Sequence, residues 1–192
     1  MPPTPTGPRA GSVSFEDDLL ILVDGNDNEV GHLDKAACHD GDGVRHRAFS
    51  IFIVNHRGEL LLQQRAAGKR LWPLYWSNSC CSHPRAGEAM ADAVTRRLQE
   101  ELGLSVALEP VYRFEYHARF GQAGSEHELC SVYVGFCDQA PVEHPEEIAA
   151  WRWISPEDLD REMCQSPHTF TPWFVLEWRR LRADYPARLQ PS

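Results

Sequence analysis

The sequence lacks any apolar run long enough to cross a bilayer. Its longest aliphatic run is the short stretch from Leu19 to Val23, whereas a membrane-spanning helix needs about 20 apolar residues. The N-terminal part carries four prolines before Gly11 but no apolar segment typical of a signal peptide. We therefore expect a cytoplasmic protein with no membrane partner, and a disordered tail over residues 1–14.

Positive charge is also scarce. Lys and Arg number 19 against 28 Asp and Glu, which gives a formal net charge of −9. Because surfaces that bind nucleic acid normally carry a basic stripe, we expect no nucleic-acid partner. An anionic ligand would have to be bound by cations concentrated in one place. Without an export signal, the six cysteines are expected to be reduced thiols: Cys38, Cys80, Cys81, Cys130, Cys137 and Cys164.

The 192 residues suffice for one domain, which we expect over 15–185, with a C-terminal tail at 186–192. Apolar alternation and turn residues predict a hairpin over 19–33 and strands over 45–55, 60–62, 76–81, 111–120, 126–137 and 149–154. A polar loop is expected over 63–72 and helices over about 89–102, from 156 and from 172. This order predicts an α+β fold with a mixed β-sheet core sandwiched between helices.

The stretch from Asn78 to Gly103 carries more chemistry than a folding core requires. It places a thiol, an imidazole, a guanidinium and two carboxylates in one strand-loop-helix unit. Residues four apart share a helix face, so Arg97 and Glu101 should point the same way. Taken alone, such pairs could be ordinary surface ion pairs that contribute about 0.3–0.5 kcal/mol each.

Three histidines and two glutamates form a candidate metal site. Glu126 and Glu128 lie two apart on a predicted strand, so both carboxylates leave the same face about 7 Å apart. Two such acids repel each other unless a positive group lies between them. Imidazole and carboxylate ligands suit a borderline divalent ion. The candidate ligands are His39, His46, His83, Glu126 and Glu128. Each histidine alone could equally be satisfied by a backbone group.

Cys81 lies two residues before His83, so in an extended segment the two side chains share a face. A thiol beside a metal should ionise more easily than free cysteine, whose pKa is about 8.5. The alternative is a small buried hydrophobe, which is the common state of a free cysteine. We expect Cys80 to point the opposite way, into the core.

The loop-helix resembles the Nudix box, whose glutamates hold a divalent cation against a diphosphate. Glu88, Arg96, the apolar residue 98, the Glu100-Glu101 pair and Gly103 follow its spacing. Ser82 stands where the box has its first Gly, and Arg97 stands where it has the first Glu of its Arg-Glu pair. The departures weaken a hydrolytic interpretation.

Several separate motifs together resemble type I isopentenyl-diphosphate isomerases, which are Nudix-fold enzymes. The similarity runs from about residue 20 to 181. The motifs are His39-x6-His46-Arg-Ala-Phe-Ser, Arg65 with Lys69 and Trp72-Pro73, Trp76-Ser-Asn-Ser-x-Cys81-x-His83-Pro84, the box helix, Glu126-x-Glu128 and Pro172-Trp173.

The resemblance implies a role for each candidate residue. The three histidines and two glutamates would hold Mn²⁺ or Zn²⁺. One Mg²⁺, completed by the substrate diphosphate, would bind Glu101 and the backbone carbonyl of Cys81. Four cations would bind the diphosphate: Lys35, Arg65, Lys69 and Arg97. Arg97 would thus be a cation directed at phosphate where a hydrolase has a carboxylate.

The reaction that the resemblance implies is the interconversion of isopentenyl and dimethylallyl diphosphate through a tertiary carbocation. Cys81 and Glu128 would act on opposite sides of the alkene, with Glu128 as donor to the isopentenyl terminal carbon as the working assignment. Tyr116 would hydrogen-bond Glu128, and Trp173 would shield the cation with its ring.

Two other functions compete with the isomerase. A Nudix hydrolase would need a complete box and no thiol, and a diphosphate-sequestering protein would need neither Cys81 nor Glu128. The expected partner is a small prenyl diphosphate, and the expected assembly is a monomer or a weak homodimer.

Overall fold

The computed structural model describes residues 11 and 13–191. Its β-strands are β1 (Leu19–Val23), β2 (Glu29–Asp34), β3 (His46–Val54), β4 (Leu60–Arg65), β5 (Trp76–Ser77), β6 (Cys80–Ser82), β7 (Leu108–Phe120), β8 (Gly124–Phe136) and β9 (Ile148–Ile154). Its helices are α1 (Lys35–Cys38), α2 (Met90–Leu102), α3 (Pro156–Gln165), α4 (Pro172–Asp184) and the 3₁₀ turns η1 (Pro167–Thr169) and η2 (Pro186–Leu189).

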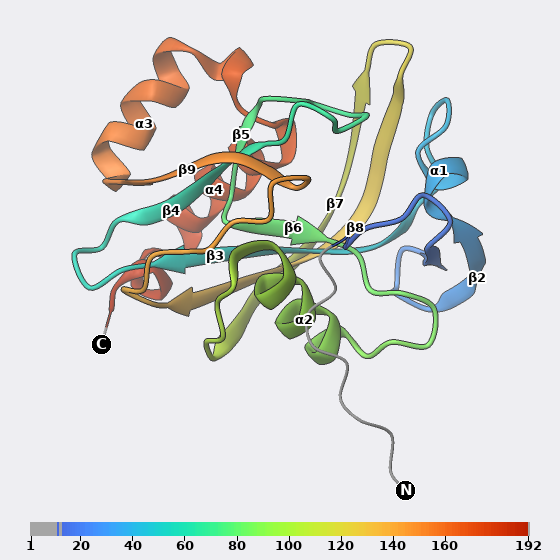
Figure 1. The fold of residues 1–192 in the computed structure, drawn as a ribbon, viewed down its shortest axis with the longest axis horizontal. Helices are drawn as coiled ribbons and strands as arrows, with labels where there is room; N and C mark the ends of the chain where they lie inside the picture. Colours follow the sequence, from blue (N-terminus) through green and yellow to red (C-terminus); the bar gives the residue numbers. More distant parts are fainter. Residues whose placement is uncertain (1–10, 12, 192) are drawn as a thin grey trace, which may run out of the picture.

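The nine strands form one mixed sheet around β3 (Figure 1). β3 pairs in parallel with β8 along its whole length and antiparallel with β6. β7 and β8 form a long hairpin, and β9 pairs with β4. The parallel pairing brings together two strands that are about 80 residues apart in the sequence, as the register of His46 with Glu128 shows.

The two faces of β3 carry separate halves of the core. Ile51 and its neighbours two residues away pack with Leu98 of α2, whereas Phe52 packs with Phe174 and Trp178 of α4. Because side chains alternate along a strand, an unbroken apolar run covers both faces at once. The helices α2 and α4 therefore lie on opposite faces of the sheet (Figure 1), which confirms the predicted sandwich.

Two helix ends are capped by residues that commonly take these positions. The Ser155 hydroxyl accepts a hydrogen bond from the Asp158 amide at the start of α3, and Gly103 ends α2 with a left-handed φ of 65°. Thr171, at the start of α4, makes no capping bond and instead contacts the Ser77 hydroxyl at 2.8 Å. This contact joins α4 to β5 inside the core.

One prediction about local structure is wrong. The polar loop expected from residue 63 begins only after Arg65, because β4 continues to Arg65 while paired with β5 and β9. Polar residues persist in this strand because Gln64 and Arg65 lie at the rim of the sheet and are only half-buried. Lys69 lies in the loop, as predicted.

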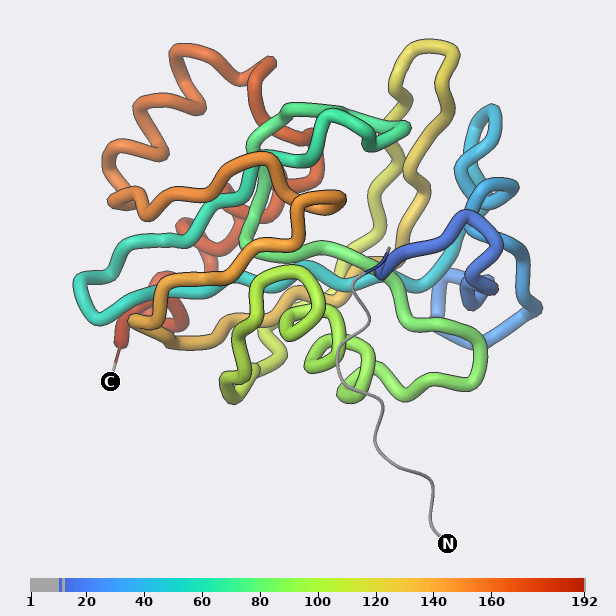
Figure 2. Tube along the Cα trace, viewed as in Figure 1, coloured from blue at the N-terminus to red at the C-terminus, as the bar shows by residue number. Residues whose placement is uncertain are grey.

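The segments at the two ends contact the domain. Val13 accepts a hydrogen bond from Arg97 at 2.7 Å, and Leu189 packs into the core from η2. Figure 2 shows the first described segment, in dark blue, beside the end of β6. Residues 1–10 and 12 of the predicted tail lie outside the described residues, and the domain bounds 15–185 stay a prediction. None of the helices in the described part of the chain is long and apolar enough to span a membrane.

Candidate active site

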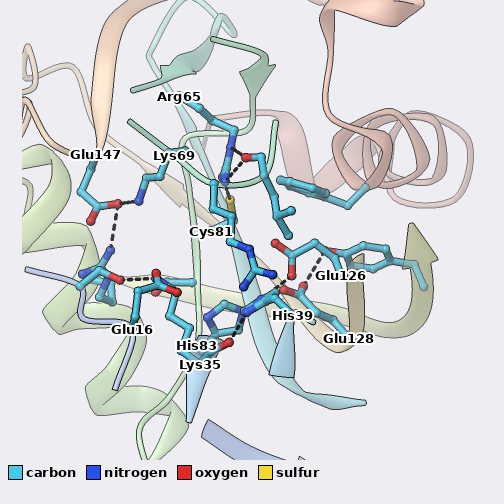
Figure 3. A pocket seen from close by; sticks show the side chains of 17 residues that line it. Glu16, Lys35, His39, Arg65, Lys69, Cys81, His83, Glu126, Glu128 and Glu147 are labelled. Carbon is cyan, nitrogen blue, oxygen red and sulfur yellow. Dashed lines mark hydrogen bonds and ion pairs between the residues drawn. The ribbon is translucent and has the colours of Figure 1, made fainter. Parts of the chain in front are cut away.

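An open cavity lies beside β6 and the β7–β8 hairpin (Figure 3). Its lining is rich in charged side chains, with a few aromatic and aliphatic ones. Eleven of the thirteen predicted site residues line it: Lys35, His39, Arg65, Lys69, Cys81, His83, Arg97, Tyr116, Glu126, Glu128 and Trp173. The other two, His46 and Glu101, are buried against lining residues.

The five candidate metal ligands converge. Ligand atoms from His39, His46, His83, Glu126 and Glu128 all lie within 4.8 Å of one another. The Nε2 atom of His39 lies 2.8 Å from the Glu126 carboxylate, and Nε2 of His83 lies 2.9 Å from Glu128. This arrangement could hold a divalent metal ion, since few buried groups of this kind approach so closely without a positive charge between them.

Strand register explains the convergence. His46 begins β3 directly opposite Glu128 on β8, and Tyr116 of β7 lies opposite Glu128 on its other side. His83 follows β6, which also pairs with β3. His39 enters from the end of α1, where its carbonyl accepts a hydrogen bond from the Ser125 amide.

The imidazoles have the orientation of metal ligands. Nδ1 of His39 lies 2.6 Å from the Lys35 carbonyl, and Nδ1 of His46 lies 2.7 Å from the Val44 carbonyl. A carbonyl can only accept, so each Nδ1 carries a proton and each Nε2 faces the cluster, where it could bind a metal ion. Nε2 of His46 is buried and has no hydrogen-bond partner among the described residues. The donor set therefore fits a metal ion.

Burial and mutual repulsion shift the ligand pKa values in different directions. Burial lowers the pKa of His46 to about 4 and that of His83 well below its usual value. Burial opposes ionisation of Glu126, but the adjacent His39 lowers the pKa of Glu126 to about 2. Burial and the neighbouring Glu126 raise the pKa of Glu128 well above its usual value. One carboxylate thus stays ionised and the other is protonated unless a positive charge joins them.

Burial governs the pKa of the Cys81 thiol. Burial and, to a smaller extent, nearby carboxylates that include Glu128 raise this pKa to about 12, against the attraction of Arg65, whose Nη1 lies 4.0 Å from the sulfur. The chain's own residues thus favour the protonated thiol, and the easier ionisation expected beside a metal ion stays a prediction. The predicted directions hold, since Cys80 is fully buried in the α2 half of the core and Cys81 lines the cavity.

Aromatic rings close the cavity over Glu128. The Tyr116 hydroxyl donates to the Glu128 carboxylate at 2.7 Å. Trp173 lies with its ring centroid 6.0 Å from that of Tyr116 and 5.2 Å from that of Trp72. The Arg65 guanidinium lies 5.3 Å from the Trp173 centroid. Trp173 thus presents a ring face beside a cation, a geometry in which the ring can stabilise positive charge.

The four predicted diphosphate cations line one half of the cavity. Arg65 is fixed by the backbone carbonyls of Leu71 and Trp72. Arg97 is 3 % exposed, and its Nη2 lies 2.5 Å from the Glu101 carboxylate. The pair is not the surface ion pair that the helix pattern alone would favour. Removing either partner of such a pair would leave the other as an unpaired buried charge and would destabilise the fold.

The remaining box residues are structural. The Glu88 carboxylate accepts two hydrogen bonds from the Arg96 guanidinium, at 2.6 and 2.8 Å, and one from the Arg85 amide. This bidentate pair holds the loop against α2. Glu88 and Arg96 do not line the main cavity.

Three acidic residues in or behind the cavity were not among the predicted site residues. Glu147 forms ion pairs with Lys69 and Arg97, and Glu16 pairs with Lys35 at 3.4 Å. Glu177 is buried behind the site near Cys130. Glu147 and Glu16 lie in irregular segments, which carry no periodicity, and no feature of the sequence distinguishes them from other surface acids.

The comparisons with known proteins agree with this geometry. A family model of the NUDIX domain matches residues 44–174. The crystal structure of DR0079 from Deinococcus radiodurans has a TM-score of 0.71 at 24% identity and covers 85% of this chain and 98% of that chain. The fold and the box helix thus place the chain in the Nudix class.

Two bacterial relatives are more specific. Isopentenyl-diphosphate Delta-isomerase 1 of Photorhabdus laumondii is 46% identical over 161 residues, which are 83% of this chain and 92% of the relative. Isopentenyl-diphosphate Delta-isomerase of Serratia proteamaculans is 45% identical over 168 residues, or 88% and 93% of the two chains. The chain belongs to the isopentenyl-diphosphate Delta-isomerase family.

Proposed function

We propose that the protein interconverts isopentenyl diphosphate and dimethylallyl diphosphate by a 1,3-allylic proton shift, as a step of isoprenoid biosynthesis. The observation that carries the proposal is a carboxyl group and a thiol, Glu128 and Cys81, at one cavity flanked by a row of cations. An alkene is a weak base, so its protonation needs a positioned acid in a site that excludes water.

The proton shift balances with these two groups. The alkene electron pair takes a proton at the terminal carbon, which leaves a tertiary cation. A proton then leaves C2, the carbon between the cationic centre and the carbon that bears the diphosphate oxygen. The electron pair of that C–H bond forms the new double bond. We assign the donor role to Glu128 and the acceptor role to Cys81 in this direction. To accept this proton Cys81 must already be a thiolate, a form that burial disfavours and that the Arg65 guanidinium, 4.0 Å from the sulfur, would stabilise.

Tyr116 and Trp173 support this step. The Tyr116 hydroxyl fixes the orientation of the Glu128 carboxyl group by donating to one of its oxygens. Trp173 is 2 % exposed and its ring forms part of the cavity wall, where it would exclude water and face the developing positive charge.

The diphosphate would bind in the cationic half of the cavity, to Lys35, Arg65, Lys69 and Arg97. Mg²⁺ would be held by Glu101 and the Cys81 carbonyl, and it would neutralise part of the diphosphate charge. Mn²⁺ or Zn²⁺ would be held by His39, His46, His83, Glu126 and Glu128. We propose that the protein is a monomer or weak homodimer, and sedimentation velocity over a concentration series tests this oligomeric state. We also propose that it is located in the cytoplasm.

Arg97 argues against a hydrolase. It replaces a box carboxylate with a guanidinium that is itself paired with Glu101. The helix therefore offers one fewer metal-binding carboxylate than a Nudix hydrolase box has.

Proton NMR in deuterated water tests the proposal. Protein with isopentenyl diphosphate, Mg²⁺ and Mn²⁺ should produce dimethylallyl diphosphate that carries deuterium. Cys81→Ala and Glu128→Gln should each lower the rate at least about 100-fold, because positioned acid–base groups contribute about 10²–10⁴. Cys164→Ala, at an exposed cysteine, is the control and should retain the rate. Release of phosphate, or unchanged substrate with the parent protein, would refute the isomerase.

A further inference from the structure

Glu147 lies at the edge of the cavity and pairs with two of its cations. Its carboxylate forms ion pairs with Lys69 and with Nη2 of Arg97, the latter at 3.4 Å (Figure 3). The side chain is only 5 % exposed. Lys69 and Arg97 are two of the four cations that the proposed function directs at the diphosphate, and in this structure both face Glu147.

The backbone fixes Glu147 in this position. Its carbonyl accepts a hydrogen bond from the Ala66 amide at 2.9 Å, and its amide donates to the His144 carbonyl at 3.0 Å. The next residue, Ile148, begins β9 and is buried. The backbone of Glu147 is therefore anchored on both sides, and the buried side chain keeps its carboxylate at the cavity.

The surroundings of Glu147 show a need for charge compensation. Burial and the charge of nearby Lys69 lower the pKa of Lys35, so the cations of this half repel one another. Burial would oppose ionisation of Glu147, but Lys69 and Arg97 lower its pKa to about 2. Glu147 is therefore ionised throughout the working pH range, and it stands near the second buried acid, Glu101, across the Arg97 guanidinium.

We propose that Glu147 is a positioning and selectivity residue that makes diphosphate binding depend on a divalent cation. The inference rests on the proposed function and deepens it. A bare diphosphate brings several negative charges toward two buried carboxylates, which repel it and compete for Lys69 and Arg97. A diphosphate bound to Mg²⁺ carries less net negative charge, so the same carboxylates oppose it less. Glu147 thus selects the magnesium complex over the free anion.

Isothermal titration calorimetry with inorganic pyrophosphate tests this selectivity without turnover. The parent protein is titrated in magnesium-depleted, chelator-free buffer with and without added Mg²⁺, and the ratio of the two affinities is compared with that of variants. Glu147→Gln should bind free pyrophosphate on the order of tenfold tighter than the parent, since a buried like charge is removed. The same variant should gain less affinity when Mg²⁺ is present. The ratio of the affinity with Mg²⁺ to the affinity without it should therefore be smaller than in the parent.

Three further variants make the test specific. Glu147→Ala is a second neutral variant and should also lower the affinity ratio. Glu147→Asp keeps the negative charge and should have an affinity ratio close to that of the parent. Glu146→Gln, at the exposed neighbouring acid, is the matched control and should leave the ratio unchanged. An unchanged ratio in both neutral variants, or an equal weakening with and without Mg²⁺, would overturn the proposal.

The NMR assay separates this inference from the proposed function. Turnover of isopentenyl diphosphate with an unchanged ratio overturns only the role of Glu147. A narrowed ratio without turnover supports the role of Glu147 in a diphosphate site and overturns the isomerase.

Discussion

The buried acid Glu177 should make the stability of the protein depend on pH. It lies on α4 facing the sheet, it is 0 % exposed, and its Oε2 has no hydrogen-bond partner among the described residues. The other oxygen lies 3.6 Å from the Cys130 sulfur. Burial raises the pKa of Glu177 from 4.5 to about 8, only partly offset by the hydroxyl of Ser50 and the thiol of Cys130.

The sign follows from the raised pKa. The folded chain keeps the proton on Glu177 up to about pH 8, while the unfolded chain loses it near pH 4.5. The favourable contribution is therefore complete below the unfolded pKa and is lost as the pH rises through the folded pKa. Each unit in this window costs about 1.4 kcal/mol. Between pH 5 and pH 7 the group should cost about 3 kcal/mol of the free energy of unfolding.

Urea unfolding of the parent and of Glu177→Gln at pH 5, 6, 7 and 8 measures this term. The amide does not titrate, so the variant should gain about 1.4 kcal/mol per pH unit relative to the parent. All groups common to both proteins cancel in the difference. Glu157→Gln, at an exposed acid on α3, is the control and should give a flat difference. A flat difference for Glu177→Gln as well would refute a neutral buried Glu177.

Three other predictions concern the metal site and the core. Gly124 has a φ of 141°, and a Cβ at this position would clash with the His39 carbonyl oxygen. Gly124→Ala should therefore lower the affinity for a transition metal about 10–100-fold in a chelator competition. Gly121→Ala is the control and should leave the affinity unchanged, because Gly121 also has a positive φ but its Cβ would meet no atom within 4 Å. His46→Ala should reduce the bound transition metal, measured by elemental analysis after gel filtration, well below that of the parent, and an unchanged metal content would contradict the five-ligand site. Leu98→Ala in the α2 half of the core should cost about 2–5 kcal/mol in urea unfolding, and a loss below about 1 kcal/mol would show that the site collapses around the smaller side chain.

Periodicity accounts for much of what the sequence could predict. Glu126 and Glu128 share a face because they lie two apart on a strand, and both line the cavity. Cys81 and His83 do so for the same reason. The buried stripe of α4 follows from the helical spacing of Phe174, Trp178 and Leu181, all of which are buried. These are local patterns, and local patterns are visible in a single sequence.

The rest depends on which strands pair and on how deep each group lies. No local pattern specifies the parallel register that sets His46 beside Glu128. Burial of Cys81 raises its pKa, where the sequence suggested an activated thiol. Glu147 is recognisable only once β9 has brought the end of an irregular loop to Lys69. Long-range pairing and desolvation are properties of the assembled structure, and spacing along the chain does not encode them directly.

Arg97 lies between two buried acids, Glu101 and Glu147. As a helix residue four before Glu101 it must share that residue's face, and this face is buried against the loop that carries Glu147. A carboxylate at position 97 would place a third acid beside two others, a cluster suited to metal ions. A guanidinium instead balances those acids and offers paired donors that match phosphate oxygens. We infer that this one change favours holding a diphosphate over cleaving it, and leaves the chemistry to Cys81 and Glu128.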